Sequence, residues 1–206
     1  MYLLSLTFKD VVNEIILPLK LIIPQPIIKH IPGLTTNEDI RINNVLKCVP
    51  PEANCLDIGC GSNLLIKKHR LRGGKGIGVD IYGWEGVDLL VEDSSKLPFE
   101  DKTFDCITCV AALSHIPNRI DVLHECNRLL RDKGIIICTN PHPYFSIIWH
   151  KWAFWDKDQH QRGMKEGELY ALTDKEMRRI FGIAGFKGFK KHIFSWGLNN
   201  LYIFKK

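Results

Sequence analysis

The sequence predicts an α/β fold with a mostly parallel β-sheet that helices cover on both sides. Two observations lead to this prediction. Along residues 36–206, short apolar runs typical of buried strands alternate with longer amphipathic segments typical of helices. The chain also has 206 residues, of which 45% are hydrophobic, and this is enough to bury one full core. We therefore expect one domain over residues 36–206, preceded by an apolar arm at residues 1–35.

Capping residues and apolar spacing in the sequence predict three helices. Thr36 is a predicted N-cap, and the helix after it covers Asn37–Cys48. A capping box opens at Thr173, and its helix ends near Gly182 or Gly185. A helix between these two is expected to pack one face on the sheet. That face has residues at helical spacing, namely Ile120, Leu123, Asn127 and Leu130, with Leu129 alongside.

The strands are predicted from the apolar runs between these helices and after the last one. They are Asn54–Ile58, Lys75–Asp80, Asp88–Glu92, Phe104–Ala111, Gly134–Thr139, Phe186–Phe194 and Asn199–Phe204.

The most informative run is Leu56–Gly61, an apolar strand that contains Asp57 near its end and leads into a glycine turn. Such a turn lets backbone amides approach a small molecule, and the next helix directs its positive N-terminus toward it. A second carboxylate, Asp80, follows Gly59 at about the 20-residue distance expected between a glycine loop and a ribose-binding acid. Together these residues predict a site for a nucleoside that carries an additional polar arm.

The turn departs from the dinucleotide-binding fingerprint, which has glycine at its first, third and sixth positions. Here these positions hold Gly59, Gly61 and Leu64. Asp57, two residues before the first glycine, also suits an ammonium group better than a pyrophosphate. A nicotinamide oxidoreductase is therefore the weaker alternative.

Further motifs follow in a fixed order. Residues 92–99 contain Asp93 and Ser94 before a Leu-Pro-Phe turn, residues 102–105 enter the fourth strand, and residues 124–134 read as an amphipathic helix with a glycine turn. With the glycine loop, they resemble the class I S-adenosylmethionine-dependent methyltransferases. The resemblance is to the small-molecule branch, methyltransferase type 11, which includes ubiquinone and menaquinone biosynthesis enzymes. It is strong over Asn54–Thr139 and loose over the last few tens of residues.

One position departs from that family. Its first loop has a third glycine two residues after the second, where this chain has Asn63. The departure is mild, because asparagine tolerates a positive φ better than most residues.

The resemblance implies a Rossmann-like, doubly wound sheet of seven strands whose last strand is antiparallel. It also implies S-adenosyl-L-methionine as the cofactor. Asp57, Gly59, Cys60 and Gly61 would bind its methionine arm, Asp80 its ribose hydroxyls, Ile81, Asp93 and Ser94 its adenine, and Val110 and Ala111 would line the pocket near the sulfonium. For the acids and Ser94, a plain turn-forming or capping role is the alternative.

The implied reaction is attack by an acceptor atom on the sulfonium methyl group. Alignment of the reacting atoms can supply about 7–11 kcal/mol, so little covalent help from the protein is required. A general base is needed only if the acceptor must lose a proton. His115, just after the fourth strand, is the candidate base by position, and a packing histidine is the alternative.

Two segments are candidates for acceptor binding. Residues 140–172 form a predicted substrate-cap insert rich in aromatic and histidine residues, which are His142, Tyr144, Trp149, His150, Trp152, Trp155 and His160. The three tryptophans repeat every three residues, which is typical either of a core stripe or of an aromatic wall over an apolar acceptor. The arm at residues 1–35 either packs over the substrate end of the domain or forms an interfacial patch for a lipid-like acceptor.

Composition narrows the classes of binding partner that we expect. The formal net charge is +5 and no long basic run is present, so DNA is not expected and RNA is not favoured. Four prolines between Pro18 and Pro32 prevent a continuous membrane-spanning helix, although they leave room for peripheral membrane contact.

The seven cysteines are an odd number and are scattered through predicted strands and helices, which indicates a reducing cytoplasm. Cys106 and Cys109 fall on opposite faces of a strand, so we expect no metal site there.

These observations predict a methyltransferase that acts on a small, hydrophobic or aromatic acceptor. The alternatives are an RNA- or protein-directed methyltransferase and a non-catalytic subunit that binds S-adenosylmethionine. The sequence leaves the acceptor, the methylated atom and the oligomeric state open.

Overall fold

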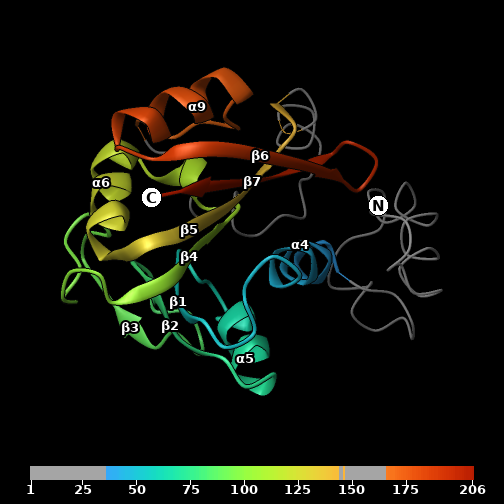
Figure 1. The fold of residues 1–206 in the computed structure, drawn as a ribbon. Helices are drawn as coiled ribbons and strands as arrows, with labels where there is room; N and C mark the ends of the chain where they lie inside the picture. The colour runs from blue at the N-terminus through green and yellow to red at the C-terminus, as the bar shows by residue number, and fades with distance from the viewer. Residues whose placement is uncertain (1–35, 144–145, 147–165) are drawn as a thin grey trace.

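One seven-stranded sheet organises the described part of the computed structural model, which comprises residues 36–143, 146 and 166–206. The strand order is β3-β2-β1-β4-β5-β7-β6 (Figure 1). The predicted arm at residues 1–35 lies outside the described residues. The strands are β1 (Asn54–Ile58), β2 (Lys75–Asp80), β3 (Leu89–Leu90), β4 (Phe104–Val110), β5 (Leu130–Pro141), β6 (Lys187–Phe194) and β7 (Asn199–Lys205).

The directions of the strands confirm the predicted doubly wound architecture. Strands β1 to β5 pair in parallel, β7 pairs antiparallel with β5, and β6 pairs antiparallel with β7. The last strand is therefore antiparallel, as the Rossmann-like expectation required. Because the five parallel strands run the same way, their carboxyl ends meet at one edge of the sheet, where open α/β sheets bind ligands.

Helices lie on both faces of the sheet (Figure 1). On one face are α4 (Asn37–Leu46) and α5 (Leu64–Leu71), and on the other are α6 (Arg119–Leu129) and α9 (Asp174–Ile183). A short 3₁₀ turn, η2 (Leu113–His115), follows β4 and leads into α6. The helices α5, α6 and α9 each follow a parallel strand, so their N-termini lie toward the carboxyl edge of the sheet.

Each face of the sheet has its own hydrophobic core. Ile42 of α4 and Leu65 of α5 pack in one cluster with Ile137 of β5. Leu123 of α6 and Phe181 of α9 belong to the second cluster. Successive strand residues point to opposite faces, so the central strands contribute to both clusters.

The cysteines follow the same alternation. Cys106 belongs to the α4–α5 side and Cys109 to the α6–α9 side, so the prediction that they face opposite ways is confirmed. All seven cysteines are free thiols, and only Cys48 among them is not fully buried.

The predicted helix starts are confirmed. Thr36 caps α4, because its hydroxyl oxygen accepts a hydrogen bond from the Asp39 amide. At α9 the Thr173 hydroxyl oxygen accepts from the Glu176 amide, and the Glu176 carboxylate accepts from the Thr173 amide. Both arrangements satisfy backbone donors that an α-helix leaves free in its first turn.

The predicted packing face of α6 was partly wrong. Leu130 begins strand β5 instead of ending the helix. Asn127 is only half-buried, and its side-chain amide donates to the Ala184 carbonyl oxygen. The residues of α6 that are buried are Val122, Leu123, Glu125, Cys126 and Leu129.

Two strands also differ from the prediction by more than one residue. The expected strand at Asp88–Glu92 is reduced to Leu89–Leu90, because the Asp88 carboxylate turns back to accept from the Gly78 amide and to pair with Arg70. Strand β5 starts at Leu130, four residues before the predicted Gly134. No helix among the described residues is both long enough and apolar enough to cross a membrane.

The aromatic stack between α9 and β7 should be a main contributor to stability. Phe181 is fully buried, and its ring lies parallel to that of Phe204 with centroids 3.8 Å apart. We expect Phe181→Ala to lower the free energy of unfolding by about 3–5 kcal/mol. As a control, Ile183→Ala, on the same helix but 50% exposed, should change it by about 0.5 kcal/mol or less. Urea denaturation followed by circular dichroism measures both, and equal losses would contradict this assignment.

Candidate functional site

Two buried carboxylates lie at the carboxyl ends of neighbouring parallel strands. Asp57 is near the end of β1 and Asp80 ends β2, and their exposed fractions are 2% and 6%. The β1–β2 register pairs Ile58 with Val79, which brings these strand ends side by side. Two buried acids so close together call for a cationic or hydrogen-bond-donating partner, because isolated buried charges are costly.

Asp57 is held by a neighbouring strand. Its Oδ1 accepts a 2.6 Å hydrogen bond from the hydroxyl of Thr108, which lies opposite it on β4. Burial raises the pKa of Asp57 from 3.8 to about 7, the nearby charge of Asp80 adds to this rise, and the Thr108 hydroxyl opposes it. The carboxyl therefore exchanges its proton near neutral pH, and a positive group placed beside it would favour the ionised form.

Asp80 fixes the glycine loop. Its Oδ2 accepts from the Gly61 amide and its Oδ1 from the Tyr82 amide, both at 2.9 Å. Each carboxylate oxygen retains a second acceptor site, so Asp80 can also accept from hydroxyl groups of a ligand. The acid thus holds the loop and remains able to bind a ligand.

The loop itself depends on backbone conformations that favour glycine. Gly59 and Gly61 have φ values of 67° and 51°. A Cβ on Gly59 would lie 2.6 Å from the Ala112 Cβ, so the loop packs directly on the end of β4. A Cβ on Gly61 would meet nothing within 4 Å, so this part of the loop borders open space.

Asn63 takes the place of the expected third glycine. Its φ of 58° confirms the prediction that asparagine would adopt the left-handed conformation there. Its side-chain amide donates to the Gly86 carbonyl oxygen at 2.9 Å, and the side chain packs so closely on Gly78 that a Cβ there would clash. Asparagine therefore supplies the conformation and also ties the loop to β2.

Cys60, between the two glycines of the loop, is unreactive. Cys60 is buried, and burial together with the charges of Asp57 and Asp80 raises the pKa of its thiol. The thiol therefore stays protonated at neutral pH. Cys60 lines the predicted site without being a reactive nucleophile.

Asp93 and Ser94 lie in the loop after β3. Asp93 accepts from the hydroxyl of Ser95 at 2.6 Å, from the Ser95 amide, and from the Asn118 side chain at 3.1 Å. Hydrogen bonds from Ser95 in particular lower the pKa of Asp93. These contacts match the turn-forming role, and each oxygen keeps acceptor capacity for a ligand. Ser94 is buried.

An ion pair between the buried Glu125 and the half-buried Arg128, which sequence reasoning missed, supports the same loop. The Glu125 carboxylate accepts from the Leu97 amide and pairs with Arg128 at 2.7 Å. Arg128 also donates to the Phe99 carbonyl oxygen. Both side chains come from α6, and the only signal for them in the sequence is their spacing of three residues on one helix.

The remaining predicted residues border the same edge of the sheet. Ile81 follows Asp80 and is 48% exposed, so its side chain is available to a ligand. Val110 ends β4, and Ala111 has a φ of 54° and donates its amide to the Thr139 hydroxyl oxygen at 3.0 Å. This strained turn directs the chain away from the sheet toward η2.

His115 lies beside a buried acid. Its Nδ1 is 3.5 Å from Oε2 of Glu168, whose side chain is 1% exposed, whereas 28% of the His115 side chain is exposed. This Nδ1 is buried and has no hydrogen-bond partner among the described residues. Sequence reasoning missed Glu168, because it is 53 positions away from His115 in the chain. The fold brings the two segments together, and the Leu169 amide donates to the Ser114 carbonyl oxygen.

The ends of the predicted insert at residues 140–172 lie side by side. The buried Asn140 side chain donates to the Leu172 carbonyl oxygen and accepts from the Leu172 amide. Ser146 donates to the Tyr170 carbonyl oxygen. The aromatic and histidine residues predicted for acceptor binding, other than His142, lie outside the described residues: Tyr144, Trp149, His150, Trp152, Trp155 and His160.

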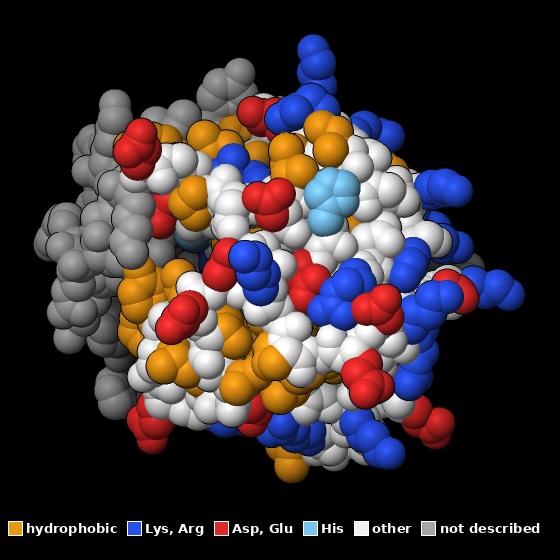
Figure 2. Space-filling view, turned by 90° about the vertical axis from the view of Figure 1, so that its left-hand side faces the viewer, with side chains coloured by type: hydrophobic (Ala, Val, Ile, Leu, Met, Phe, Trp, Pro, Cys, Tyr) orange, Lys and Arg blue, Asp and Glu red, His pale blue; other side chains and the backbone are white. Residues whose placement is uncertain are grey.

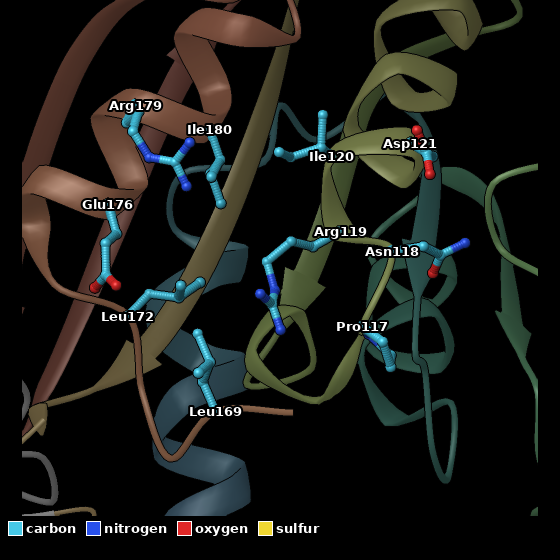
Figure 3. Close-up of a pocket in the computed structure, with 10 residues that line it drawn as sticks. All are labelled: Pro117, Asn118, Arg119, Ile120, Asp121, Leu169, Leu172, Glu176, Arg179 and Ile180. Carbon is cyan, nitrogen blue, oxygen red and sulfur yellow. The ribbon is translucent and has the colours of Figure 1, made fainter. Parts of the chain in front are cut away.

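A pocket of about 390 Å³ lies between α6 and α9 (Figure 3). Its lining residues are Pro117, Asn118, Arg119, Ile120, Asp121, Leu169, Leu172, Glu176, Arg179 and Ile180. Asn118 also contacts Asp93, so the pocket borders the loop that carries the predicted adenine-binding acid. Within the described part of the chain, no group of three or more histidine, cysteine or acidic side chains is arranged to hold a metal ion.

Comparison with known proteins agrees with this geometry. Residues 56–138 match the family model described as "Methyltransferase domain". The chain is 26% identical to the demethylmenaquinone methyltransferase of Staphylococcus saprophyticus, over 79% of this chain and 89% of that protein. It is 27% identical to that of Bacillus pumilus, over 60% of this chain and 59% of that protein.

The fold is also similar to solved structures. A SAM-dependent methyltransferase from Archaeoglobus fulgidus superposes with a TM-score of 0.64 at 17% identity, over 83% of this chain and 95% of that one. At this identity the likeness supports the fold alone. The glycine loop and both strand-end acids lie within the segment that the family model covers.

The raised pKa of Asp57 predicts a pH-dependent stability in the ligand-free protein. The folded chain holds a proton on Asp57 up to about pH 7, whereas an unfolded chain releases it near 3.8. The stabilising contribution is therefore complete below about pH 4 and is lost as pH rises to 7. We expect Asp57→Asn to reduce the fall in unfolding free energy between pH 5 and pH 7.5. Urea denaturation across this range checks it, with Asp132→Asn, 73% exposed, as the control that should retain the wild-type slope.

Proposed function

We propose that this chain, which is a class I S-adenosylmethionine-dependent methyltransferase, transfers the methyl group to a small, hydrophobic or aromatic acceptor. The observation that carries this proposal is the pair of buried acids at adjacent strand ends, joined through the glycine loop by the hydrogen bond from Gly61 to Asp80. An acid pair of this kind suits a ligand with a positive group at one end and hydroxyl groups at the other.

The residues present fit S-adenosyl-L-methionine. Asp57 would pair with the cationic methionine end, and this positive charge would favour the ionised form of a carboxyl whose pKa burial raises. Gly59, Cys60 and Gly61 would bring backbone close to that arm, since the space beside Gly61 is open. Asp80 would accept from the ribose hydroxyls. Adenine would contact Ile81, Asp93 and Ser94, and the sulfonium would lie near Val110 and Ala111.

When bound, S-adenosylmethionine supplies an electrophilic methyl group and a neutral leaving thioether. This chain would hold the acceptor atom, the methyl group and the sulfur in line and exclude water. Such positioning can lower the activation barrier by about 7–11 kcal/mol. Thr108 serves this purpose indirectly, because its 2.6 Å hydrogen bond fixes the orientation of Asp57. Glu125 and Arg128 similarly fix the loop that carries Asp93.

His115 is the proposed general base for an acceptor that must lose a proton. Glu168 would orient the imidazole and stabilise its charged form, as carboxylates do in hydrolytic triads. The 3.5 Å separation is longer than an ideal hydrogen bond, and catalytic hydrogen bonds are often long before substrates bind. The exposed part of His115 would face the acceptor.

A small acceptor is favoured by the relatives and by the surface. The relatives named above are demethylmenaquinone methyltransferases, which makes a quinone-like aromatic acceptor the natural starting point. In the view of Figure 2, lysine and arginine side chains are interspersed with acidic ones, so this face offers no continuous basic surface for RNA. The free, mostly buried thiols suit a reducing cytoplasm.

Methyl transfer from labelled S-adenosylmethionine tests the proposal. We expect label to enter low-molecular-weight, organic-extractable products of a metabolite extract, and not an RNA pool or a protein fraction. Asp80→Ala is the control for contaminating enzymes and should abolish transfer. Label in RNA or protein would favour a macromolecule-directed enzyme. Binding of S-adenosylhomocysteine without any transfer would favour a non-catalytic subunit.

The proposed base gives a separate prediction. With the acceptor found by labelling, His115→Gln should lower kcat by about 10²–10⁴-fold if the acceptor loses a proton, with little change in KM. Glu168→Gln should lower kcat less and shift the acidic limb of the pH–rate profile. As a control, His124→Gln, on the exposed side of α6, should behave as wild type. An unchanged kcat for His115→Gln would assign it a packing role.

A further inference from the structure

The pocket between α6 and α9 has a chemical character that the proposed function does not use. Apolar side chains form about half of its walls, with Ile120 on one side and Leu169, Leu172 and Ile180 on the other. Two guanidinium groups reach this space, those of Arg119 and Arg179 (Figure 3). At about 390 Å³, the pocket is within the size range of small-molecule sites.

Arg119 is incompletely satisfied. One of its terminal nitrogens donates to the Gly167 carbonyl oxygen. Its Nε is buried and has no hydrogen-bond partner in the part of the chain that the structure describes. Burial lowers the pKa of Arg119, and the charge of Glu176 partly offsets this. A buried cationic donor without an acceptor is costly, so this group points to a missing acceptor.

The acids of the pocket are not that acceptor. Glu176 uses its carboxylate in the capping box, where Oε2 accepts from the amide and the hydroxyl of Thr173. In Figure 3, Asp121 lies on the other side of α6 from the Arg119 guanidinium. Two arginines and two acids therefore line the pocket, and among the described residues neither acid accepts a hydrogen bond from the buried Arg119 Nε.

The start of α6 lies at the same pocket. Asn118 stands at the N-cap position and its side chain makes no capping hydrogen bond; its side-chain amide group donates to Asp93. The first amides of α6 thus lack a side-chain acceptor at the pocket wall. A helix N-terminus of this kind favours an anion, and here it reinforces the buried Arg119 donor.

We propose that this pocket binds a carboxylate carried by the methyl acceptor, with Arg119 and Arg179 as the specificity-determining residues. The apolar walls contact the hydrocarbon or aromatic part of the same molecule. This inference rests on the proposed function, and it takes the acceptor to be an aromatic or hydrophobic acid instead of the quinone-like starting point that the relatives suggest. The location is consistent with this role, since His115 is two residues before the pocket-lining Pro117.

The experiment uses the full chain saturated with S-adenosylhomocysteine. The probes are 3-phenylpropionate and its neutral isostere 3-phenylpropionamide, which differ only in the carboxylate. Isothermal titration calorimetry should show the acid binding at least about tenfold more tightly than the amide, since charge-assisted hydrogen bonds to arginine distinguish them. Arg119→Gln and Arg179→Gln should each bring the ratio close to one.

Arg178→Gln is the matched control, because it removes the same charge from the same helix. Its guanidinium lies over the Phe189 ring, 3.5 Å from the centroid, and does not line the pocket. It should retain the wild-type preference for the acid. Melting temperature and S-adenosylhomocysteine affinity, measured on every variant, confirm that each one is folded.

Three results would overturn the inference. They are equal binding of acid and amide, no binding of either, and an equal loss of preference in Arg178→Gln. If either pocket variant is unfolded, the wild-type comparison of acid with amide still decides the question. Retained affinity for S-adenosylhomocysteine in any of these cases would leave the proposed methyltransferase function intact, whereas loss of that affinity in the wild type would reject the proposed function itself.

Discussion

The hydrogen bond from the Gly61 amide to the Asp80 carboxylate is the interaction on which the proposed site depends. It joins the loop after β1 to the end of β2 and holds the positive-φ turn of Gly59 and Gly61 in place. Asp57 then lies buried beside this turn, and among the described residues the Thr108 hydroxyl offsets part of its desolvation. The fold thus brings two acidic side chains together at one point of the carboxyl edge, where we propose that a cationic ligand binds.

The supporting contacts extend outward from this point in both directions. On one side, Asn63 ties the loop to Gly86. On the other, Glu125 and Arg128 hold the backbone of the loop after β3 from α6. None of these side chains needs to touch a ligand. They fix backbone amides and carboxylates in position, and such fixed dipoles reduce the reorganisation that binding would otherwise require.

The acceptor side is organised differently, by contacts between segments far apart in sequence. Asn140 closes the base of the segment that ends at Leu172, and Leu169 joins the turn that carries Ser114. This brings Glu168 to His115 and places Leu169 opposite Arg119. The proposed cofactor and acceptor sites are therefore formed by different kinds of contact. Local motifs at the strand ends serve the first, and the packing of α9 and its preceding loop on α6 serves the second.

Local sequence patterns were sufficient to predict most of the helices and strands and the edge of the sheet where we propose that the cofactor binds. Strands β1 and β2 and the caps of α4 and α9 agree with the prediction, because apolar period, capping residues and the glycine turn are local properties of the chain. The left-handed Asn63 was predictable for the same reason. Only the tertiary structure placed Thr108 on Asp57, Glu168 on His115 and Arg119 in its pocket, since each depends on strand register or on helix packing. Such pairings are set by the global arrangement of the core, so they cannot be predicted from short-range sequence patterns.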